Sequence, residues 1–287
     1  MADSLFRLHD TPPLDEPVLV VALDGWIDAG SAAGTAASTI ADQVDRTLVA
    51  TFDTDVLLDF RARRPVMHLV DGVNTGLTWS TIEMHAATTD DGSDLLLLTG
   101  VEPDHAWQGF AAAVRSLAID FGARMHVGLG AYPAGVPHTR PVQLSSTAST
   151  DELAASVGFL RGTLDVPAGI EAVIEDQMSD AGLPALGIWA QVPHYISAMN
   201  YPAAAARLIE AFNDVAGTSF STAELDTSAD AVRARIDAMI ENNPEHAAML
   251  HQLEAQVDEM AQDGLGELPS GEDLAEELEQ FLRDQND

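Results

Sequence analysis

The sequence contains no cysteine and no lysine. Without cysteine there can be no disulfide, thiolate nucleophile or cysteine metal site, and this absence is typical of a reducing compartment. Without lysine there can be no Schiff-base nucleophile and no P-loop lysine. Long apolar runs are also missing, because stretches such as Val18–Leu23 are far too short to span a bilayer. The first thirteen residues lack the basic and apolar regions of a secretory signal, so we expect a cytoplasmic protein.

Positive charge is scarce. The chain has 46 acidic residues against 13 basic ones, all of them arginine, and its formal net charge is −33. Such a polyanion repels nucleic acid and anionic lipid, so we expect neither as a partner. The acidic surface has two interpretations, a solvated face that keeps the protein soluble or an acidic docking surface, and solvated faces are the more common of the two.

Apolar runs alternate with helical patterns over the first two-thirds of the 287 residues. This alternation predicts an α/β fold with a largely parallel sheet covered on both faces. A hairpin is expected around Asp90-Asp91-Gly92, and Ser31 is the expected N-cap of the first helix. The predicted strands are Val18–Leu23, Thr47–Phe52, Val66–Val70, Thr78–Thr88, Asp94–Thr99, Arg124–Leu129, Val142–Ser146 and Ala185–Gln191, with a long loop at Gly130–Pro141; the predicted helices are Ser31–Val44, Trp107–Phe121, Ala168–Ala181 and Pro202–Ala216, with a capping box at Ser149–Glu152.

The strands stop near Gly217, so we predict an α/β core domain over residues 1–216 and a helical extension over 217–287. Leu250, Leu253, Val257 and Met260 form one stripe of an amphipathic helix. A flexible linker near 263–271 precedes a final acidic helix. The apolar stripes either pack on the chain itself, which is the usual outcome, or dock a partner.

Four chemically unusual segments follow predicted strands, where open α/β sheets bind their ligands. They start at Asp24, Thr99, Gly130 and Val192. If the strands are parallel, these loops emerge at one edge of the sheet. The candidate binding cluster at this edge comprises Asp24, Trp26, Asp28, Glu102, Trp107, Tyr132, His138, Thr139, Arg140 and Tyr195.

Each candidate has a structural alternative. The glycines at 25, 30 and 34 resemble a phosphate-binding turn, but a tight turn and close helix packing explain them as well. His138 or His194 could act as a general base beside an anion held by Arg140. Alternatively, Arg140 pairs with Asp24, Asp28 or Glu102 as part of the fold. No paired-histidine spacing supports a metal site from Asp28, Glu102 and His194, so we expect no metal and no cofactor.

Several ordered motifs carry a family resemblance: Pro17–Gly30, Leu97–Asp104 with Trp107, and above all Pro137-His138-Thr139-Arg140-Pro141. Over residues 15–216 the chain resembles the actinobacterial branch of the proteasome assembly chaperone 2 family. The resemblance implies a three-layer α/β/α fold with a largely parallel or mixed sheet, similar to that of purine nucleoside phosphorylases. It also implies small homo-oligomers, a trimer being favoured, and a proteasome-related protein partner.

Two functions therefore compete. The first is an oligomeric, non-enzymatic assembly or binding protein, and the second is a nucleoside phosphorylase-like or hydrolase-like enzyme or small-anion binder. Geometry separates them. Polar side chains that line one open cavity favour the second, whereas side chains bonded within the chain or at a subunit contact favour the first. We favour the first.

Overall fold

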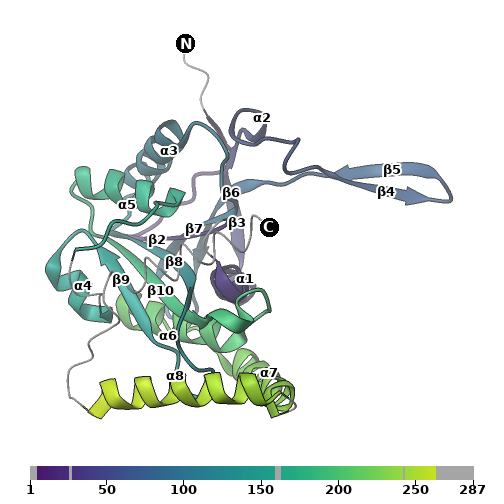
Figure 1. Cartoon of the computed structure of the whole chain (residues 1–287). Helices are drawn as coiled ribbons and strands as arrows, with labels where there is room; N and C mark the ends of the chain where they lie inside the picture. The colour runs from purple at the N-terminus through teal and green to yellow at the C-terminus, as the bar shows by residue number, and fades with distance from the viewer. Residues whose placement is uncertain (1–4, 26–27, 159–162, 242, 263–287) are drawn as a thin grey trace. The chain divides into compact units, whose positions relative to one another are not determined.

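The computed structural model of the chain describes residues 5–25, 28–158, 163–241 and 243–262 (Figure 1). Its strands are β1 Phe6–Leu8, β2 Val18–Asp24, β3 Arg46–Phe52, β4 Val66–Val70, β5 Val73–Thr78, β6 Ile82–Thr88, β7 Asp94–Val101, β8 Met125–Ala134, β9 Leu144–Ala148 and β10 Ala185–Pro193. Its α-helices are α1 Ala32–Asp42, α2 Thr54–Leu57, α3 Trp107–Asp120, α4 Asp151–Val157, α5 Ile170–Asp180, α6 Pro202–Ala216, α7 Ala223–Glu241 and α8 Pro244–Gln262, with short 3₁₀ turns η1 Ala29–Ser31 and η2 His194–Ile196.

The fold is mixed α/β, with a large mixed sheet flanked by helices. The strand order is β1-β3-β6-β7-β2-β8-β10-β9, and β4 and β5 form a separate two-stranded sheet. Strand β2 runs parallel to β7 and β8, whereas β1, β3, β6 and β7 pair antiparallel in succession, as do β9 and β10. The predicted α/β class with a mixed sheet is confirmed. Likeness to nucleoside phosphorylases stays a prediction.

The chain forms two compact units. Unit 1 comprises Met1–Trp26, Ala41–Gly128 and Ala168–Ala185, and unit 2 comprises Ile27–Ile40, Leu129–Pro167 and Leu186–Asp287. Each unit is assembled from separated stretches of sequence. The predicted boundary at residue 216 stays a prediction, while the linker near 263–271 and the final acidic helix lie outside the described residues.

Unit 1 is built around a hydrophobic core between its strands and the helices α3 and α5. Strand β2 is buried at six of its seven residues, as expected for a strand covered on both faces. Phe52 and Phe110 are stacked with their ring centroids 4.8 Å apart, which fixes α3 against β3. The apolar face of α5 adds Ile170, Ile174 and Met178.

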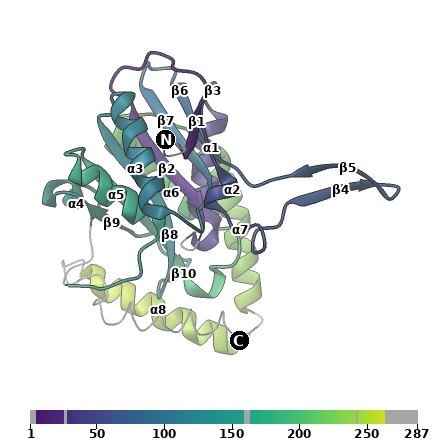
Figure 2. The ribbon, with the colours of Figure 1, turned by 90° about the horizontal axis from the view of Figure 1, so that it is seen from above.

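Unit 2 contains the remaining helices. Helix α1 is made largely of small residues and buries Ala32, Ala36 and Ile40 completely. Helix α6 matches the predicted Pro202–Ala216, with proline at its start and Gly217 in the left-handed conformation at its end. Strand β8 and helices α7 and α8 complete the frame that positions the candidate site described below; Figure 2 shows the ribbon from above.

Three local predictions are wrong. Ser31 is not the N-cap of α1, because it lies in η1 with a left-handed φ of 50°. The predicted loop at Gly130 is instead the second half of β8, and Gly130 is needed because a Cβ there would lie 2.2 Å from the Trp189 ring. The predicted strand Thr78–Thr88 is divided, since β5 ends at Thr78 and β6 begins at Ile82.

Candidate functional site

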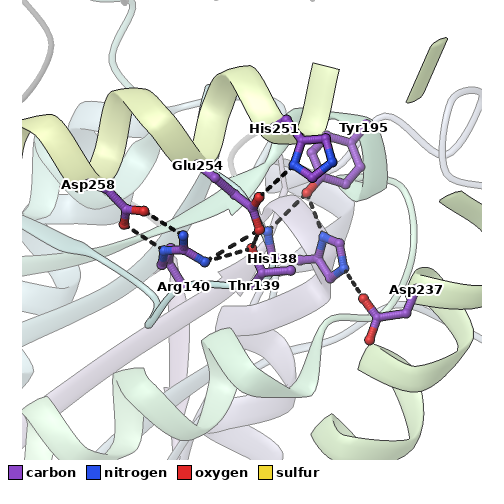
Figure 3. Close-up of polar contacts among 8 residues, drawn as sticks. All are labelled: His138, Thr139, Arg140, Tyr195, Asp237, His251, Glu254 and Asp258. Carbon is purple, nitrogen blue, oxygen red and sulfur yellow. Dashed lines mark hydrogen bonds and ion pairs between the residues drawn. The ribbon is translucent and has the colours of Figure 1, made fainter. Parts of the chain in front are cut away.

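The Pro137–Pro141 loop follows β8 and is bonded to both C-terminal helices (Figure 3). The His138 side chain is fully buried, and its Nε2 lies 3.0 Å from Oδ1 of Asp237 on α7. Its Nδ1 lies 2.8 Å from the hydroxyl oxygen of Tyr195, which also accepts the backbone N–H of His138 at 2.9 Å. Both ring nitrogens of His138 are therefore engaged within unit 2.

This pattern of bonds assigns the protons. Because the backbone N–H of His138 already donates to the Tyr195 oxygen, the phenol donates its own proton to Nδ1. The ring proton then sits on Nε2 and is donated to Asp237. Burial is the main cause that raises the pKa of Tyr195 to about 12, so the phenol keeps this proton at neutral pH. His138 has no free lone pair with which to take a proton from a substrate.

Arg140 is held by helix α8 through a two-pronged ion pair. Its Nε donates to Asp258 Oδ1 at 2.7 Å and its Nη2 donates to Oδ2 at 2.6 Å. The fork of the guanidinium matches the two oxygens of one carboxylate, which is the arrangement that makes such pairs strong and directional. The hydrogen bond with Asp258 is the main cause that raises the pKa of Arg140, and the same bond lowers the pKa of Asp258.

Glu254 on α8 joins the other side of the loop. Its Oε1 accepts the hydroxyl of Thr139 at 2.6 Å and lies 3.4 Å from Nη1 of Arg140, while its Oε2 lies 3.2 Å from Nδ1 of His251. The hydrogen bond from Thr139 is the main cause that lowers the pKa of Glu254. Consecutive residues of one loop thus contact two carboxylates on neighbouring turns of α8 (Figure 3).

These partners correct our expectation for Arg140. We predicted pairing with Asp24, Asp28 or Glu102, but the guanidinium binds Asp258 and Glu254 instead. Sequence reasoning missed all the carboxylates of α7 and α8, which lie about a hundred residues further along the chain. The apolar stripe did predict α8, and Leu250 and Leu253 are buried. The acidic residues between them gave no signal of their own, because acidic residues occur throughout the sequence.

In unit 1, Glu102 serves the helix α5. Its Oε1 accepts the backbone N–H of Ile170 at 2.9 Å, at a helix start where the N-cap, Gly169, has no side chain to offer. Gly25 allows this approach, because a Cβ there would lie within 2.5 Å of the Glu102 side chain. The backbone N–H of Glu102 also donates to the carbonyl of Asp24 at 2.8 Å. The first two predicted segments therefore do meet, but for a structural purpose.

The neighbouring candidates in unit 1 are also engaged. Trp107 donates its indole N–H to the carbonyl of Pro103 at 2.5 Å. Asp104 accepts the backbone N–H of Asp59 at 2.8 Å and pairs with Arg63, so it fixes the chain that leads to β4. Asp24 is exposed at the end of β2, and Trp26 lies outside the described residues.

In unit 2, Asp28 occupies the place at which a bound anion was one of our alternatives. Its carboxylate accepts the N–H groups of Ala33 at 2.7 Å and Gly34 at 3.1 Å, at the start of α1. Gly30 adopts a left-handed φ of 66°, and a Cβ there would lie 2.8 Å from that of Tyr201. The glycine-rich segment thus builds a turn that the protein's own carboxylate completes, as the structural alternative proposed.

The remaining candidates lie apart from the Pro137–Pro141 loop bonds. Tyr132 is hydrogen-bonded to Ser145 at 3.1 Å, and His194 is exposed and lies 3.4 Å from the carbonyl of Ala134. Over the described ranges, no group of three or more His, Asp or Glu is arranged to hold a metal ion. Nor does any helix there have the length and apolar character needed to cross a membrane. That all the predicted loops share one edge stays a prediction.

The comparisons with known proteins decide the family. The model of the PAC2 family matches residues 22–240. The chain belongs to the PAC2 family. This confirms the resemblance that the Pro137–Pro141 motif carried. A search of curated proteins found no match.

Solved structures extend this PAC2 assignment. A Corynebacterium glutamicum protein of unknown function is 32% identical, with a TM-score of 0.86, 91% of this chain covered and 99% of the other. Rv2714 of Mycobacterium tuberculosis, also of unknown function, is 34% identical, with a TM-score of 0.85 and 91% and 93% covered. Rv2125 of the same species, a proteasome-assembly chaperone homologue, is 32% identical, with a TM-score of 0.76 and 81% and 99% covered.

Proposed function

We propose that this PAC2 protein is a non-enzymatic, self-associating assembly factor whose partner is proteasome-related. The observation that carries the proposal is how the polar groups of the Pro137–Pro141 loop are used. Arg140 is bonded to Asp258, and the lone pair of His138 accepts the phenol proton of Tyr195. An enzyme or anion receptor needs such groups directed at a substrate, whereas here they attach two helices.

Similarity supports the partner. Rv2125, at 32% identity, is a homologue of proteasome-assembly chaperones, and chains this similar over most of their length share their fold closely. Fold alone does not transfer a function, so the partner has to be tested directly. The arrangement in unit 2 is consistent with a binding protein, because a loop clamped by helices presents a fixed surface without a reacting group.

The test is reconstitution with proteasome α and β subunits from the same organism. We expect the chain to bind α subunits and to raise the yield of assembled particles severalfold on native gels. A variant with Arg207→Ala, which removes an exposed pair with Glu210 on α6, is the matched control and should act like the wild type. No binding and no change in yield would contradict the chaperone role.

A thermal-shift screen with phosphate, nucleosides and nucleotides tests the enzymatic alternative. A ligand that binds only the folded state raises its apparent stability. We expect no shift beyond that of chloride at equal ionic strength, because Asp258 already occupies the fork of Arg140. Asp258→Asn weakens this pairing. If phosphate stabilises that variant and the wild type alike, the loop is an anion site and the non-enzymatic proposal is wrong.

A further inference from the structure

The ribbon formed by β4 and β5, residues Val66–Thr78, is the most apolar exposed surface in the described part of the chain. Every residue of both strands is exposed. Twelve large hydrophobic side chains of the described residues are exposed, and seven of them lie between residues 66 and 79: Val66, Met67, Leu69, Val70, Val73, Leu77 and Trp79. The other five are scattered along the sequence. Concentrated apolar exposure of this kind marks an interaction surface.

The sequence of the ribbon specifies its shape. Asp71 and Gly72 have φ values of 51° and 81°, which gives the two-residue turn that Asp-Gly favours between antiparallel strands. Val70 pairs with Val73 beside this turn, and Met67 pairs with Leu77 further along. At the root, the rings of Phe60 and Trp79 meet edge to face with centroids 4.8 Å apart. Figures 1 and 2 both show the ribbon extending beyond the other strands of unit 1.

The ribbon has apolar side chains on both of its faces. Alternate residues of a strand point to opposite sides, so Val66 and Val70 share one face while Met67 and Leu69 share the other. Its outer edges are also open, since β4 and β5 pair only with each other. An isolated two-stranded ribbon is at best marginally stable in water. A ribbon that is apolar on both faces therefore needs a covering partner.

Charge indicates which partner fits. From Phe60 to Trp79 the chain carries three arginines and a single aspartate, whereas the whole chain has a net charge of −33. Arg61 and Arg64 are exposed at the root. Two copies of so acidic a chain repel each other least where they meet through their ribbons. Another ribbon is also the only concentrated apolar surface that the described residues of a second copy can offer.

We infer that the ribbon is the self-association surface of this protein, and that the ribbons of separate copies cover one another's apolar faces. The inference rests on the self-association part of the proposed function and names the element responsible. It also predicts the effect of salt. Because apolar contact attracts the copies while their net charges repel, screening by salt strengthens the association. A contact made by the arginines with the acidic body of another copy would weaken instead.

Light scattering and sedimentation of the full chain, at low and high NaCl, test the inference. We expect a particle whose mass is a multiple of 30.4 kDa and which persists to lower protein concentration in high salt. The triple variant Val66→Thr/Leu69→Thr/Val73→Thr makes both faces polar and keeps residues that favour strands. Its dissociation constant should rise at least about 100-fold. The control Val56→Thr/Ile119→Thr/Val166→Thr changes three equally exposed side chains elsewhere and should associate like the wild type.

A second measurement uses the absence of cysteine. Val70→Cys places a single thiol on the ribbon, and Ile119→Cys places one at a similarly exposed position on α3. Under mild oxidation we expect Val70→Cys to form a covalent dimer much faster than Ile119→Cys. If the wild type is a 30.4 kDa monomer at both salt concentrations, self-association itself fails. If it associates but the triple ribbon variant does so equally and Val70→Cys does not cross-link, only the role of the ribbon fails.

Discussion

At the scale of single residues, buried polar groups determine how this protein responds to pH. Most of them have partners: Glu102 binds the start of α5, and His138 is bonded at both ring nitrogens. His126 on β8 differs, because it is 1% exposed and neither of its ring nitrogens has a hydrogen-bond partner in the described protein. Burial lowers the pKa of His126 to about 4. A neutral imidazole is tolerated there, while a charged one is not.

We predict that His126 makes the protein less stable in mild acid. The unfolded chain binds a proton near pH 6.5, whereas the folded chain does so only near pH 4. Stability is thus fully present above pH 6.5 and is lost as pH falls toward 4, by about 3 kcal/mol in total and about 2 kcal/mol by pH 5. Urea unfolding at several pH values measures this loss.

The matched comparison is His126→Leu, which removes the titrating group, against His246→Gln on the exposed side of α8. His126→Leu should be at least as stable as the wild type at pH 7, because it buries no unpaired nitrogen. Between pH 7 and 5 it should lose about 2 kcal/mol less than the wild type. Equal losses in the wild type and His126→Leu would show that another group causes the acid sensitivity.

The residue scale also shows where sequence reasoning stops. It selected Asp28, Glu102, His138 and Arg140 as the polar residues that matter, and each makes specific bonds. It did not find the partners of Arg140. Asp258 lies 118 residues further along, and nothing in the local sequence distinguishes it from the other acidic residues. Partners of this kind are set by the tertiary fold, which no local pattern encodes.

At the scale of elements, periodicity worked for strands and helices with a buried side. The predicted hairpin is present in β6 and β7, where Thr88 pairs with Asp94, and helix α6 has the predicted bounds. The ribbon is the instructive failure. Val66–Val70 was predicted as a strand, but its partner β5 was not. Asp71-Gly72 between two valines was the available signal, since Asp-Gly is a strong hairpin turn.

Helix α8 should detach from the Pro137–Pro141 loop in acid before the cores unfold. Hydrogen bonds from Arg140 and Thr139 lower the pKa values of Asp258 and Glu254 respectively. A carboxylate with a depressed pKa stabilises the fold above its unfolded pKa and loses that contribution as pH falls through the folded value. The attachment is therefore complete at neutral pH and is lost below about pH 4, where carboxylates protonate.

The same attachment should fail at neutral pH in Arg140→Ala. Hydrogen exchange measures it, because local opening exposes the amides of α8 without unfolding the rest. We expect exchange in α8 to be on the order of tenfold faster, with exchange in α6 unchanged, since exposed ion pairs support their neighbourhood and not the whole fold. Arg207→Ala removes a comparable pair on α6 and should leave α8 as it is. Equal acceleration in α6 and α8 would mean that Arg140 supports the global fold.

At the scale of the whole molecule, the sequence predicted the α/β class and the family, because both depend on many residues at once. It could not predict the order of the strands. Unit 1 and unit 2 are each assembled from distant stretches, and β8 passes from one into the other at Gly128. Alternating strands and helices are compatible with several such orders. The order is selected by the packing of side chains between elements that are far apart in sequence.

The net charge of −33 gives a last prediction, which concerns the whole chain. Repulsion among 46 acidic residues opposes folding, and only a few of them are bonded to the 13 arginines. Salt shortens the range of this repulsion from about 10 Å at 0.1 M to about 3 Å at 1 M. Over this range of NaCl we expect the thermal midpoint to rise on the order of 5 °C, because screening removes more repulsion than attraction.

Self-association also raises the midpoint, so the measurement belongs on the Val66→Thr/Leu69→Thr/Val73→Thr variant at low protein concentration. KCl should act like NaCl, since screening depends on ionic strength and not on the cation. Mild acid does not substitute for salt. Between pH 7 and 5 the carboxylates stay ionised and the repulsion persists, while His126 destabilises the fold. A midpoint that falls as salt is added would show that the ion pairs, Arg140 with Asp258 among them, outweigh the repulsion.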